Sequence, residues 1–536
     1  MIAWTIYITF AGAVLLLFLP RAFSRWIALL TTTGTFAISL ATFFCHDLDL
    51  AQFTTIVRVP WVPALGMNYH LAVDGISLTL VLVTSITAVS SVLFSWDVAN
   101  SASGGQLLQR GNNPPHQSAS RSGWVTQPVD ATGCPSAAKR VDQRSNEFFF
   151  WLLLVVGGSF GVFLSADLFL LFVFYELVIV PKYLLIAIWG STNKEYGAMK
   201  LTLYSFFGGA LVFIGIIAAY VTAGSLDLNE FAQFRFTPQL QSWAFPVLFI
   251  GFAVLAGIWP LHTWAPTGHV AAPTAGSMLL AGIVMKLGAY GGLRVAMNLF
   301  PQGFQMWSSW IAILAVTGIV YAAAVALRQR DLKFVIGYSS VSHMGFVLLG
   351  LATANVLGVS GAVLQMFSHG VIGALLFAVA GRMIYRRTHT RDLDELSLME
   401  LNRALPFASF VFVIASAASM GIPGFSGFAA EITILIGVWK TFPIAVWITG
   451  AGMVLVAAFT LRALKRSFFD TAVEEGQNVK GVTTLNREAL EPITVPEKLG
   501  AVLLMFATLA IGIYPKFLLD RIVPAVEAMR FLKTGG

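Results

Sequence analysis

The sequence predicts an all-α polytopic membrane protein with about 14 transmembrane helices. Hydrophobic residues make up 57% of the 536 residues and charged residues only 11%. Soluble domains carry about 25% charged residues, so this composition excludes an ordinary soluble protein. The mean hydropathy of +0.78 agrees with a membrane protein. Apolar runs recur from one end of the chain to the other, and two of them contain helix-breaking residues near their middle.

The apolar runs are long enough to cross a bilayer, which takes about 20 residues each. The segments begin near Ile2, Trp26, Gly75, Phe148, Asp167, Ala198, Ala244, Pro273, Trp307, Phe334, Gly358, Pro406, Pro443 and Leu499. The first run has no basic stretch before it and no small-residue cleavage site after it. We therefore expect a retained helix there rather than a signal peptide.

The basic residues indicate which loops lie in the cytoplasm. Lys and Arg gather after the first, third, fifth, ninth, eleventh and thirteenth segments, whereas loops such as HDLDL and SLDLNEF are acidic. The seventh loop carries neither Lys nor Arg and is neutral on this point. Because Lys- and Arg-rich loops stay in the cytoplasm, we expect an even number of helices with both termini outside. We attribute the net charge of +7 to these basic loops, which set the orientation in the membrane, and we expect no nucleic-acid partner.

The loop at residues 99–145 differs from the others, because it is polar and rich in Gly, Ser, Asn and Pro. That composition is typical of a disordered cytoplasmic loop. Binding to a neighbouring subunit is the alternative that the composition leaves open.

Two segments contain residues that interrupt a helix. The seventh carries Pro260 and Pro266, and the twelfth contains SMGIPGFSGF. Proline removes a backbone donor, and lipid does not tolerate unpaired backbone, so we expect protein or trapped water to cover these breaks. Interrupted helices at corresponding positions of two halves are typical of inverted repeats around a midplane ion site.

The spacing of the two breaks predicts two five-helix repeats. We divide the chain into helices one to three at 1–98, the insertion at 99–145, a first repeat of helices four to eight at 146–300, a second repeat of helices nine to thirteen at 301–469, and a loop with helix fourteen at 470–536.

Several ionisable residues fall within the predicted spans. They are Glu176, Lys182, Lys286, His343, His369 and Glu431. A charge at bilayer depth costs at least roughly 2.5 kcal/mol, so such residues usually face a cavity or one another. Histidine titrates near neutral pH, and a buried lysine gives up its proton readily. The order of carboxylate, lysine, two histidines and carboxylate predicts a line that passes protons sideways through the protein.

Other interpretations of these residues stay open. Each one is also compatible with a structural polar contact between helices, worth about 1 kcal/mol, and Lys182 with snorkelling toward the headgroups. His262 and His269, which follow the break in the seventh helix, are candidates either for a proton entrance or for ordinary polar loop residues.

A substrate channel or solute symporter is the competing class of function, because it would use similar broken helices. The sequence offers no phosphate-binding glycine loop, no dinucleotide fingerprint and no haem pattern. Cys45 and Cys134 form no CxxC pair, so we expect no metal site and no redox chemistry of the chain's own.

The chain resembles a known family, the antiporter-like subunits of respiratory complex I, over nearly its whole length apart from the insertion. The motifs that carry the resemblance are LAVDGISLTLVLVT, FYELVIVP, WPLHTW, APTAGSMLLAGIVMKLGAYGGLR, IGYSSVSHMGF and GIPGFSGFAAEITILIG. Glu431 makes the sequence most similar to the M-type subunits, the counterparts of mitochondrial subunit 4, since L-type and N-type subunits carry lysine there. The chain also ends soon after helix fourteen and lacks the long lateral helix of the L type.

The resemblance implies a proton-translocating subunit of NADH:quinone oxidoreductase in the bacterial inner membrane, with L-type and N-type neighbours. It implies two inverted repeats that form linked half-channels. NADH, FMN, iron–sulfur clusters and quinone would belong to partner subunits, with no cofactor in this chain. A subunit of an Mrp-type cation/proton antiporter or of a membrane-bound hydrogenase is the alternative within the same fold.

The resemblance also assigns roles to residues of the predicted line. Glu176 would be the carboxylate of helix five, Lys286 the central lysine, His343 and His369 the connecting histidines, and Glu431 the exit residue.

The sequence departs from the family pattern beside Glu176. The family places a lysine in helix seven at the position that is Leu255 here, and an aspartate at the position of Thr267. Lys182 stands where the family has an apolar residue, which makes it a candidate substitute for the missing lysine. It lies six residues after Glu176, about 120° around a helix. We therefore expect the two to meet only across a cavity or through water.

Overall fold

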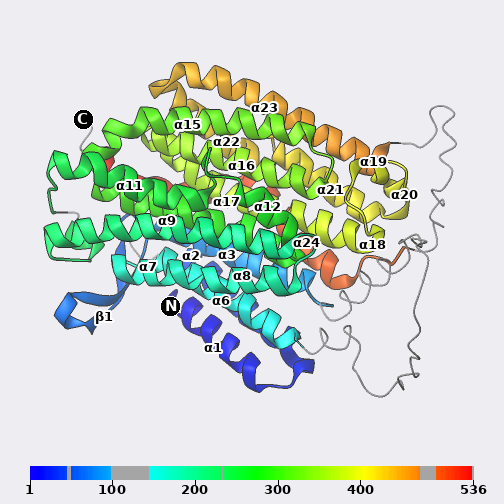
Figure 1. Ribbon diagram of the computed structural model, residues 1–536, viewed down its shortest axis with the longest axis horizontal. Helices are drawn as coiled ribbons and strands as arrows, with labels where there is room; N and C mark the ends of the chain where they lie inside the picture. The colour runs from blue at the N-terminus through cyan, green and yellow to red at the C-terminus, as the bar shows by residue number, and fades with distance from the viewer. Residues whose placement is uncertain (45–49, 98–143, 232, 471–489, 534–536) are drawn as a thin grey trace, which may run out of the picture.

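The computed structural model describes residues 1–44, 50–97, 144–231, 233–470 and 490–533. The described residues form a bundle of helices that run roughly along one direction (Figure 1). The predicted insertion lies outside these residues except for its last two, and helix α6 already begins at Ser145.

Helices dominate the described residues. The α-helices are α1 Trp4–Phe18, α2 Ser24–Phe44, α3 Gly75–Phe94, α6 Ser145–Leu164, α7 Leu168–Leu177, α8 Ile179–Trp189, α9 Lys194–Ala223, α10 Leu228–Phe231, α11 Pro238–Ala256, α12 Trp264–Ala271, α13 Thr274–Leu279, α14 Met285–Gly291, α15 Pro301–Arg328, α16 Leu332–Ala352, α17 Val356–Ala378, α18 Arg386–Thr388, α19 Leu393–Leu396, α20 Leu401–Ala404, α21 Pro406–Ser419, α22 Ser426–Thr441, α23 Pro443–Leu464, α24 Val495–Ile513, α25 Lys516–Glu527 and α26 Arg530–Lys533. The 3₁₀ turns are η1 Arg21–Phe23 and η2 Pro63–Leu65, and the π-helical segments are η4 Leu280–Val284, η5 Gly292–Met297, η6 Val379–Tyr385 and η7 Lys465–Phe469.

The helices confirm the predicted membrane class. Within the described residues, 12 helices are long and apolar enough to cross a membrane. Two shorter apolar helices, Trp4–Phe18 and Pro406–Ser419, occupy two further predicted segments. The fold is therefore all-α and polytopic, and the exact count of fourteen crossings stays a prediction.

The spans differ in how deeply the protein covers them. The most apolar windows of Thr274–Met297 and Val356–Thr388 are 100% buried, whereas that of Pro443–Phe469 is 28% buried. Figure 1 accordingly shows α16 and α17 inside the bundle, with α23 and α1 along its two edges. Polar side chains on the deeply buried helices must find their partners within the protein, because no solvent reaches them.

Both predicted breaks are present. The seventh helix ends at Ala256, where Gly257 adopts a φ of +82°, and resumes with α12. The twelfth ends at Ser419 and resumes at Ser426, with Gly421 and Gly424 at φ values of +69° and +96°. Glycine tolerates this left-handed backbone because it has no Cβ.

The sequence analysis missed a third interruption, in the fifth helix. Helix α7 ends at Leu177, one residue after Glu176, and α8 begins at Ile179. Pro181 lies in the first turn of α8, where its missing N–H costs least. A helix junction therefore separates Glu176 from Lys182.

The N-terminal region contains a β-hairpin that the sequence analysis did not predict. Strands β1 (Thr54–Val62) and β2 (Met67–Val73) pair antiparallel. The turn between them contains Gly66, which has a φ of +68°. The strands are rich in Thr, Val, Ile and aromatic residues, which favour extended backbone.

Two matched backbone bridges lie at the ends of the two predicted repeats. Asp167, which caps α7, bridges to Asp227, and Asp331, which caps α16, bridges to Asp392. The first bridge adjoins the hairpin, because His70 Nδ1 lies 3.0 Å from the Asp227 carboxylate. Asp392 caps α19, and Figure 1 places β1 and α19 at opposite ends of the bundle. Repeats of opposite orientation would produce this arrangement, and the division into two repeats stays a prediction.

Candidate functional site

The central lysine of the predicted line is joined to a histidine. Lys286 is the second residue of α14, which directly follows the π-helical segment η4. Its Nζ donates to the Ala281 carbonyl and lies 2.8 Å from Nδ1 of His369 on α17. When the lysine donates to Nδ1, the neutral histidine ring carries its proton on Nε2. That Nε2 is buried and has no hydrogen-bond partner.

The two histidines face each other. The ring centroids of His369 and His343 are 5.7 Å apart, with the planes tilted by 32°. No hydrogen bond joins the two rings, both of which lie in the described part of the chain. His343 comes from α16, so this contact links helix ten to helix eleven.

The second carboxylate completes the line. Nδ1 of His343 lies 3.3 Å from Oε1 of Glu431 on α22. Glu431 is 3% exposed. A Cβ added at Gly421, in the break of the twelfth helix, would lie 2.7 Å from Oε2 of Glu431. The break therefore makes room for the carboxylate. We call Lys286, His369, His343 and Glu431 the relay line.

Two further polar side chains contact His343 and were not predicted from the sequence. Ser419 Oγ, at the end of α21, lies 3.1 Å from Nε2. Nε2 of the Gln365 amide lies 3.5 Å from Nδ1. Gln365 comes one helical turn before His369 on α17, a spacing that could have signalled it.

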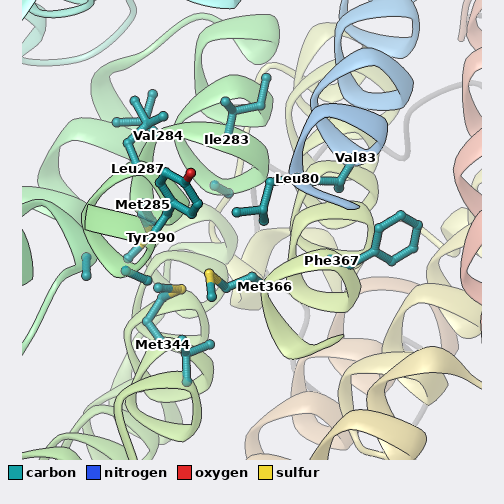
Figure 2. Packing of buried hydrophobic residues seen from close by; sticks show 14 of the residues in the cluster. Leu80, Val83, Ile283, Val284, Met285, Leu287, Tyr290, Met344, Met366 and Phe367 are labelled. Carbon is teal, nitrogen blue, oxygen red and sulfur yellow. The ribbon is translucent and has the colours of Figure 1, made fainter. Parts of the chain in front are cut away.

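Apolar side chains surround the relay line. Figure 2 shows Leu80 and Val83 of α3 packed near residues of η4, α14, α16 and α17, including Met285 and Met344, which precede and follow Lys286 and His343 in the sequence. All of these side chains are buried. Electrostatic and hydrogen-bond interactions are stronger in such surroundings than in water, and an unpaired polar group is correspondingly costly.

Glu176, like Glu431, lies beside a glycine that makes room for its carboxylate, but its buried oxygen lacks a partner. Its Oε1 is buried and makes no hydrogen bond. A Cβ added at Gly209 of α9 would overlap this oxygen, so the glycine provides the space that the carboxylate occupies. Neither carboxylate oxygen forms an ion pair with any described residue.

Lys182 is also an ionisable side chain without a hydrogen-bond partner. It is 3% exposed, and its Nζ makes no hydrogen bond. The amine is therefore enclosed by protein and does not snorkel. A cavity of about 10 Å³ adjoins it, lined mainly by Val155, Leu279, Leu280 and Val284. Lys182 thus faces α6 and helix eight, whereas Glu176 faces α9, and no ion pair joins the two.

The remaining predicted residues do not join the relay line. Leu255, at the position of the family lysine, is buried in α11 at 2% exposure. Thr267 Oγ1 lies 3.4 Å from Nζ of Lys200. His262 packs edge-on against Tyr321 with ring centroids 5.5 Å apart, and His269 stacks on Phe377 at 4.5 Å.

Several other buried charges form ion pairs that hold helices together. Arg294 pairs with Asp74, the N-cap of α3. Glu497 of α24 binds Arg382 at 2.6 Å and Arg387 at 2.8 Å. These pairs tie helices three, eight, eleven and fourteen together. Among the described residues, no group of three His, Cys, Asp or Glu side chains could hold a metal ion; Cys45 and Cys134 lie outside them.

Comparison with protein families identifies a match. A family model described as "NADH:quinone oxidoreductase/Mrp antiporter, TM" matches residues 165–457. Subunit M of the NADH-quinone oxidoreductase of Rhodobacter capsulatus is 32% identical over 517 residues, which cover 94% of this chain and 90% of the relative. Chain 4 1 of the NAD(P)H-quinone oxidoreductase of Synechococcus elongatus is 34% identical and covers 92% of this chain and 84% of its own.

Solved structures share the fold. A chain of respiratory complex I from Thermus thermophilus with bound NADH has a TM-score of 0.81 at 24% identity, with 100% of both chains covered. A chain of the Mrp complex from Dietzia has a TM-score of 0.78 at 17% identity, with 98% of this chain and 97% of that chain covered.

Proposed function

Because the chain belongs to the NADH:quinone oxidoreductase/Mrp antiporter transmembrane family, we propose that it is the M-type membrane-arm subunit of a bacterial NADH:quinone oxidoreductase. In this role it translocates protons, while other subunits carry electrons from NADH to quinone. The chain is a translocase subunit with no redox centre of its own. The relatives named subunit M and chain 4 support the M type.

The relay line is the observation that carries this proposal. It brings a lysine, two histidines and a glutamate from four separate helices into one buried row, with contacts of 2.8 Å, 5.7 Å between ring centres, and 3.3 Å. A structural role would need only that each group be paired. A continuous row of groups that can each give and take a proton is what proton transfer requires.

In the proposed path, the Lys286 ammonium gives a proton to Nδ1 of His369. The charged ring then releases its other proton from Nε2, which has no competing partner. His343 receives this proton across the gap between the rings and releases one from Nδ1 to Oε1 of Glu431. Each step moves one proton. Afterwards His369 carries its proton on Nδ1 and His343 on Nε2, so both rings must return to their starting tautomers, and Lys286 must be protonated again, before the next proton passes.

We include Glu176 and Lys182 in the first half of the path, as a switch and a substitute base. A buried carboxylate oxygen and a buried amine that both lack a partner are unfavourable, so their retention supports a function. Their separation means that any exchange between them runs through water or through movement at the junction between α7 and α8.

The partners and location follow from the same proposal. L-type and N-type subunits would flank this chain in the inner membrane, and NADH, FMN, iron–sulfur clusters and quinone would bind elsewhere in the complex. The arginine-rich end of the bundle, with α18 and α19, would face the cytoplasm. Both termini would lie on the periplasmic side. For the C-terminus, the position of α26 supports this, because Arg530 donates to the Phe231 carbonyl of α10, near the hairpin, at 2.8 Å.

The decisive experiment uses the purified complex in liposomes. NADH is added with a quinone, and quinone reduction and acidification of the lumen are followed together. We expect an uncoupler to abolish the acidification. In a His343→Met complex, we expect the rate of acidification to fall at least about tenfold. The matched control is His389→Asn, an exposed loop histidine with a φ of +56° that asparagine tolerates.

Two results would reject the proposal. Acidification by the His343→Met complex at the wild-type rate would remove the relay line from the path. Purification of the chain with antiporter or hydrogenase subunits, without NADH-dependent quinone reduction, would instead assign it to an Mrp-type antiporter or a membrane-bound hydrogenase.

A further inference from the structure

The side chains around His343 make conflicting demands on one ring nitrogen. Glu431 Oε1 lies 3.3 Å from Nδ1 and, as a carboxylate, can only accept a proton from it. The Gln365 amide lies 3.5 Å from the same Nδ1 through Nε2, which can only donate. The first contact requires a proton on Nδ1, and the second requires a bare nitrogen.

The other ring nitrogen imposes no such choice. Ser419 Oγ lies 3.1 Å from Nε2 of His343. A hydroxyl both donates and accepts, so Ser419 satisfies Nε2 whether or not it carries a proton. Selection between the two forms of the ring therefore depends on what lies at Nδ1.

Gln365 itself is left incomplete by this arrangement. Its side chain is 2% exposed, and its Oε1 is buried without a partner. A buried carbonyl oxygen without a hydrogen bond costs about 1–3 kcal/mol in general. A half-turn of the amide would present Oε1 to Nδ1, but a protonated Nδ1 already has an acceptor in Oε1 of Glu431, so the amide adds a hydrogen bond only when Nδ1 is bare.

We propose that Gln365 is a positioning residue that selects which nitrogen of His343 carries the proton, and so favours release to Glu431 over return. After release, Nδ1 is bare and accepts from the Gln365 amide, while Nε2–H donates to Ser419. The added hydrogen bond stabilises the state in which Glu431 holds the proton. This inference rests on the proposed function and deepens it, because it names the group that biases one transfer step.

Gln365→Met tests the inference, since methionine has nearly the same length but neither donor nor acceptor. In liposomes containing the whole complex, we expect coupled acidification to fall about fivefold, the effect of one neutral hydrogen bond. The largest pH gradient that the complex sustains should also fall, because return from Glu431 is no longer disfavoured. Quinone reduction with an uncoupler present should stay within about twofold of wild type.

Ser360→Ala is the matched control. Ser360 lies on the same helix, is 1% exposed, and has a hydroxyl without a hydrogen-bond partner. It makes no hydrogen bond to any member of the relay line. Its loss should leave both the rate and the sustained gradient unchanged, which separates the proposed role from a general effect of altering buried polarity on α17.

Gln365→Glu supplies a second, independent test. A protonated glutamic acid presents one donor and one acceptor, as the amide does, whereas the ionised form only accepts. We expect this variant to approach wild-type acidification at low pH and to resemble Gln365→Met at high pH. A merely structural role would not produce this pH-dependent recovery.

Wild-type rate and gradient in Gln365→Met would overturn the inference. If that variant does not assemble, pH-independent acidification by Gln365→Glu at the wild-type rate overturns it, and pH-dependent recovery supports it. Failure of both to assemble would assign Gln365 to folding and also overturn it. A wild-type complex that forms no gradient at all would refute the proposed function itself, which is a distinguishable result.

Discussion

Glu176 and Glu431 occupy similar local settings but have opposite surroundings. Both lie on interrupted helices, and both carboxylates lie where a glycine, Gly209 or Gly421, leaves room for them. Glu431 nevertheless contacts His343, whereas the buried oxygen of Glu176 has no partner. The residue type and the helix break are thus shared, and the difference comes from what the facing helices present.

The same contrast holds for the two lysines. Lys286 donates to a carbonyl and to His369, and the window of its helix is 100% buried. Lys182 is also enclosed, but its amine adjoins only a cavity of about 10 Å³. A cavity of that size holds at most one water molecule, and an apolar lining disfavours even that. The second half is therefore connected in the structure, and the first half is not.

The largest effect is expected for Lys286→Met, because Lys286 begins the connected half. Removing the amine leaves His369 without its donor, so we expect acidification and quinone reduction to fall together by roughly tenfold or more. Both are measured in the same liposome preparation, with Lys516→Met, on the exposed surface of α25, as control. Full electron transfer with lost acidification would show that the relay line is not tightly coupled to the redox reaction.

A direct comparison of Glu431→Gln with Glu176→Gln comes next. Both changes are nearly isosteric, so both complexes should assemble. We expect Glu431→Gln to lose most acidification, because glutamine cannot take a proton from His343. Glu176→Gln removes a carboxylate without a partner, and we expect a loss of about threefold or less, under 1 kcal/mol. Equal losses in the two variants would break the contrast between connected and unconnected halves.

Lys182→Met tests whether the unpaired amine serves function at the expense of stability. Replacing an enclosed amine that lacks a hydrogen bond by an apolar side chain should stabilise the protein by roughly 1–3 kcal/mol. Acidification should fall if Lys182 substitutes for the missing lysine. Thermal unfolding of the solubilised complex and liposome acidification give the two measurements.

The double variant Lys182→Met with Leu255→Lys sharpens the result. If a base anywhere in the first half suffices, restoring the lysine at 255 should recover part of the acidification. Normal acidification by the single variant would instead show that Lys182 has no part in the path.

The smallest effect on acidification is expected at the bridged ends of the two repeats, where a change should act on stability instead. Burial raises the pKa of Asp227, but hydrogen bonds from His70 and Asn229 and the Arg58 charge outweigh it and hold the pKa below its usual value. A lowered pKa in the folded state gives stability that is present above the unfolded pKa of about 3.9 and is lost as the pH falls through the lower, folded value.

Asp227→Asn should therefore destabilise the complex at pH 7 by about 1 kcal/mol, and the difference from wild type should shrink as the pH approaches 3. Thermal unfolding at several pH values measures this, with Asp392→Asn at the matched bridge as the comparison. A difference that persists unchanged at low pH would show that the carboxylate charge is not the cause.

The sequence predicted the relay line better than its surroundings. Lys286, His343, His369 and Glu431 were identified as charges or histidines within apolar runs, and they meet in the structure. Gln365 and Ser419 were missed, because neutral polar residues are common in membrane helices. The hairpin at 54–73 and the junction at Val178 were also missed, since short extended segments and single-residue helix interruptions leave no long periodic pattern.

What the sequence by itself determined is the membrane class, the two glycine- and proline-rich breaks and the candidate titratable residues, because each follows from local composition. Only the tertiary structure decided which candidates meet. Lys182 and Glu176 lie six residues apart in sequence, yet they face different helices, whereas Lys286 and His369 lie 83 residues apart and are in contact at 2.8 Å. The reason is physical: the cost of burying a polar group is a property of the residue, but its compensation depends on a partner that only the packing of distant helices supplies.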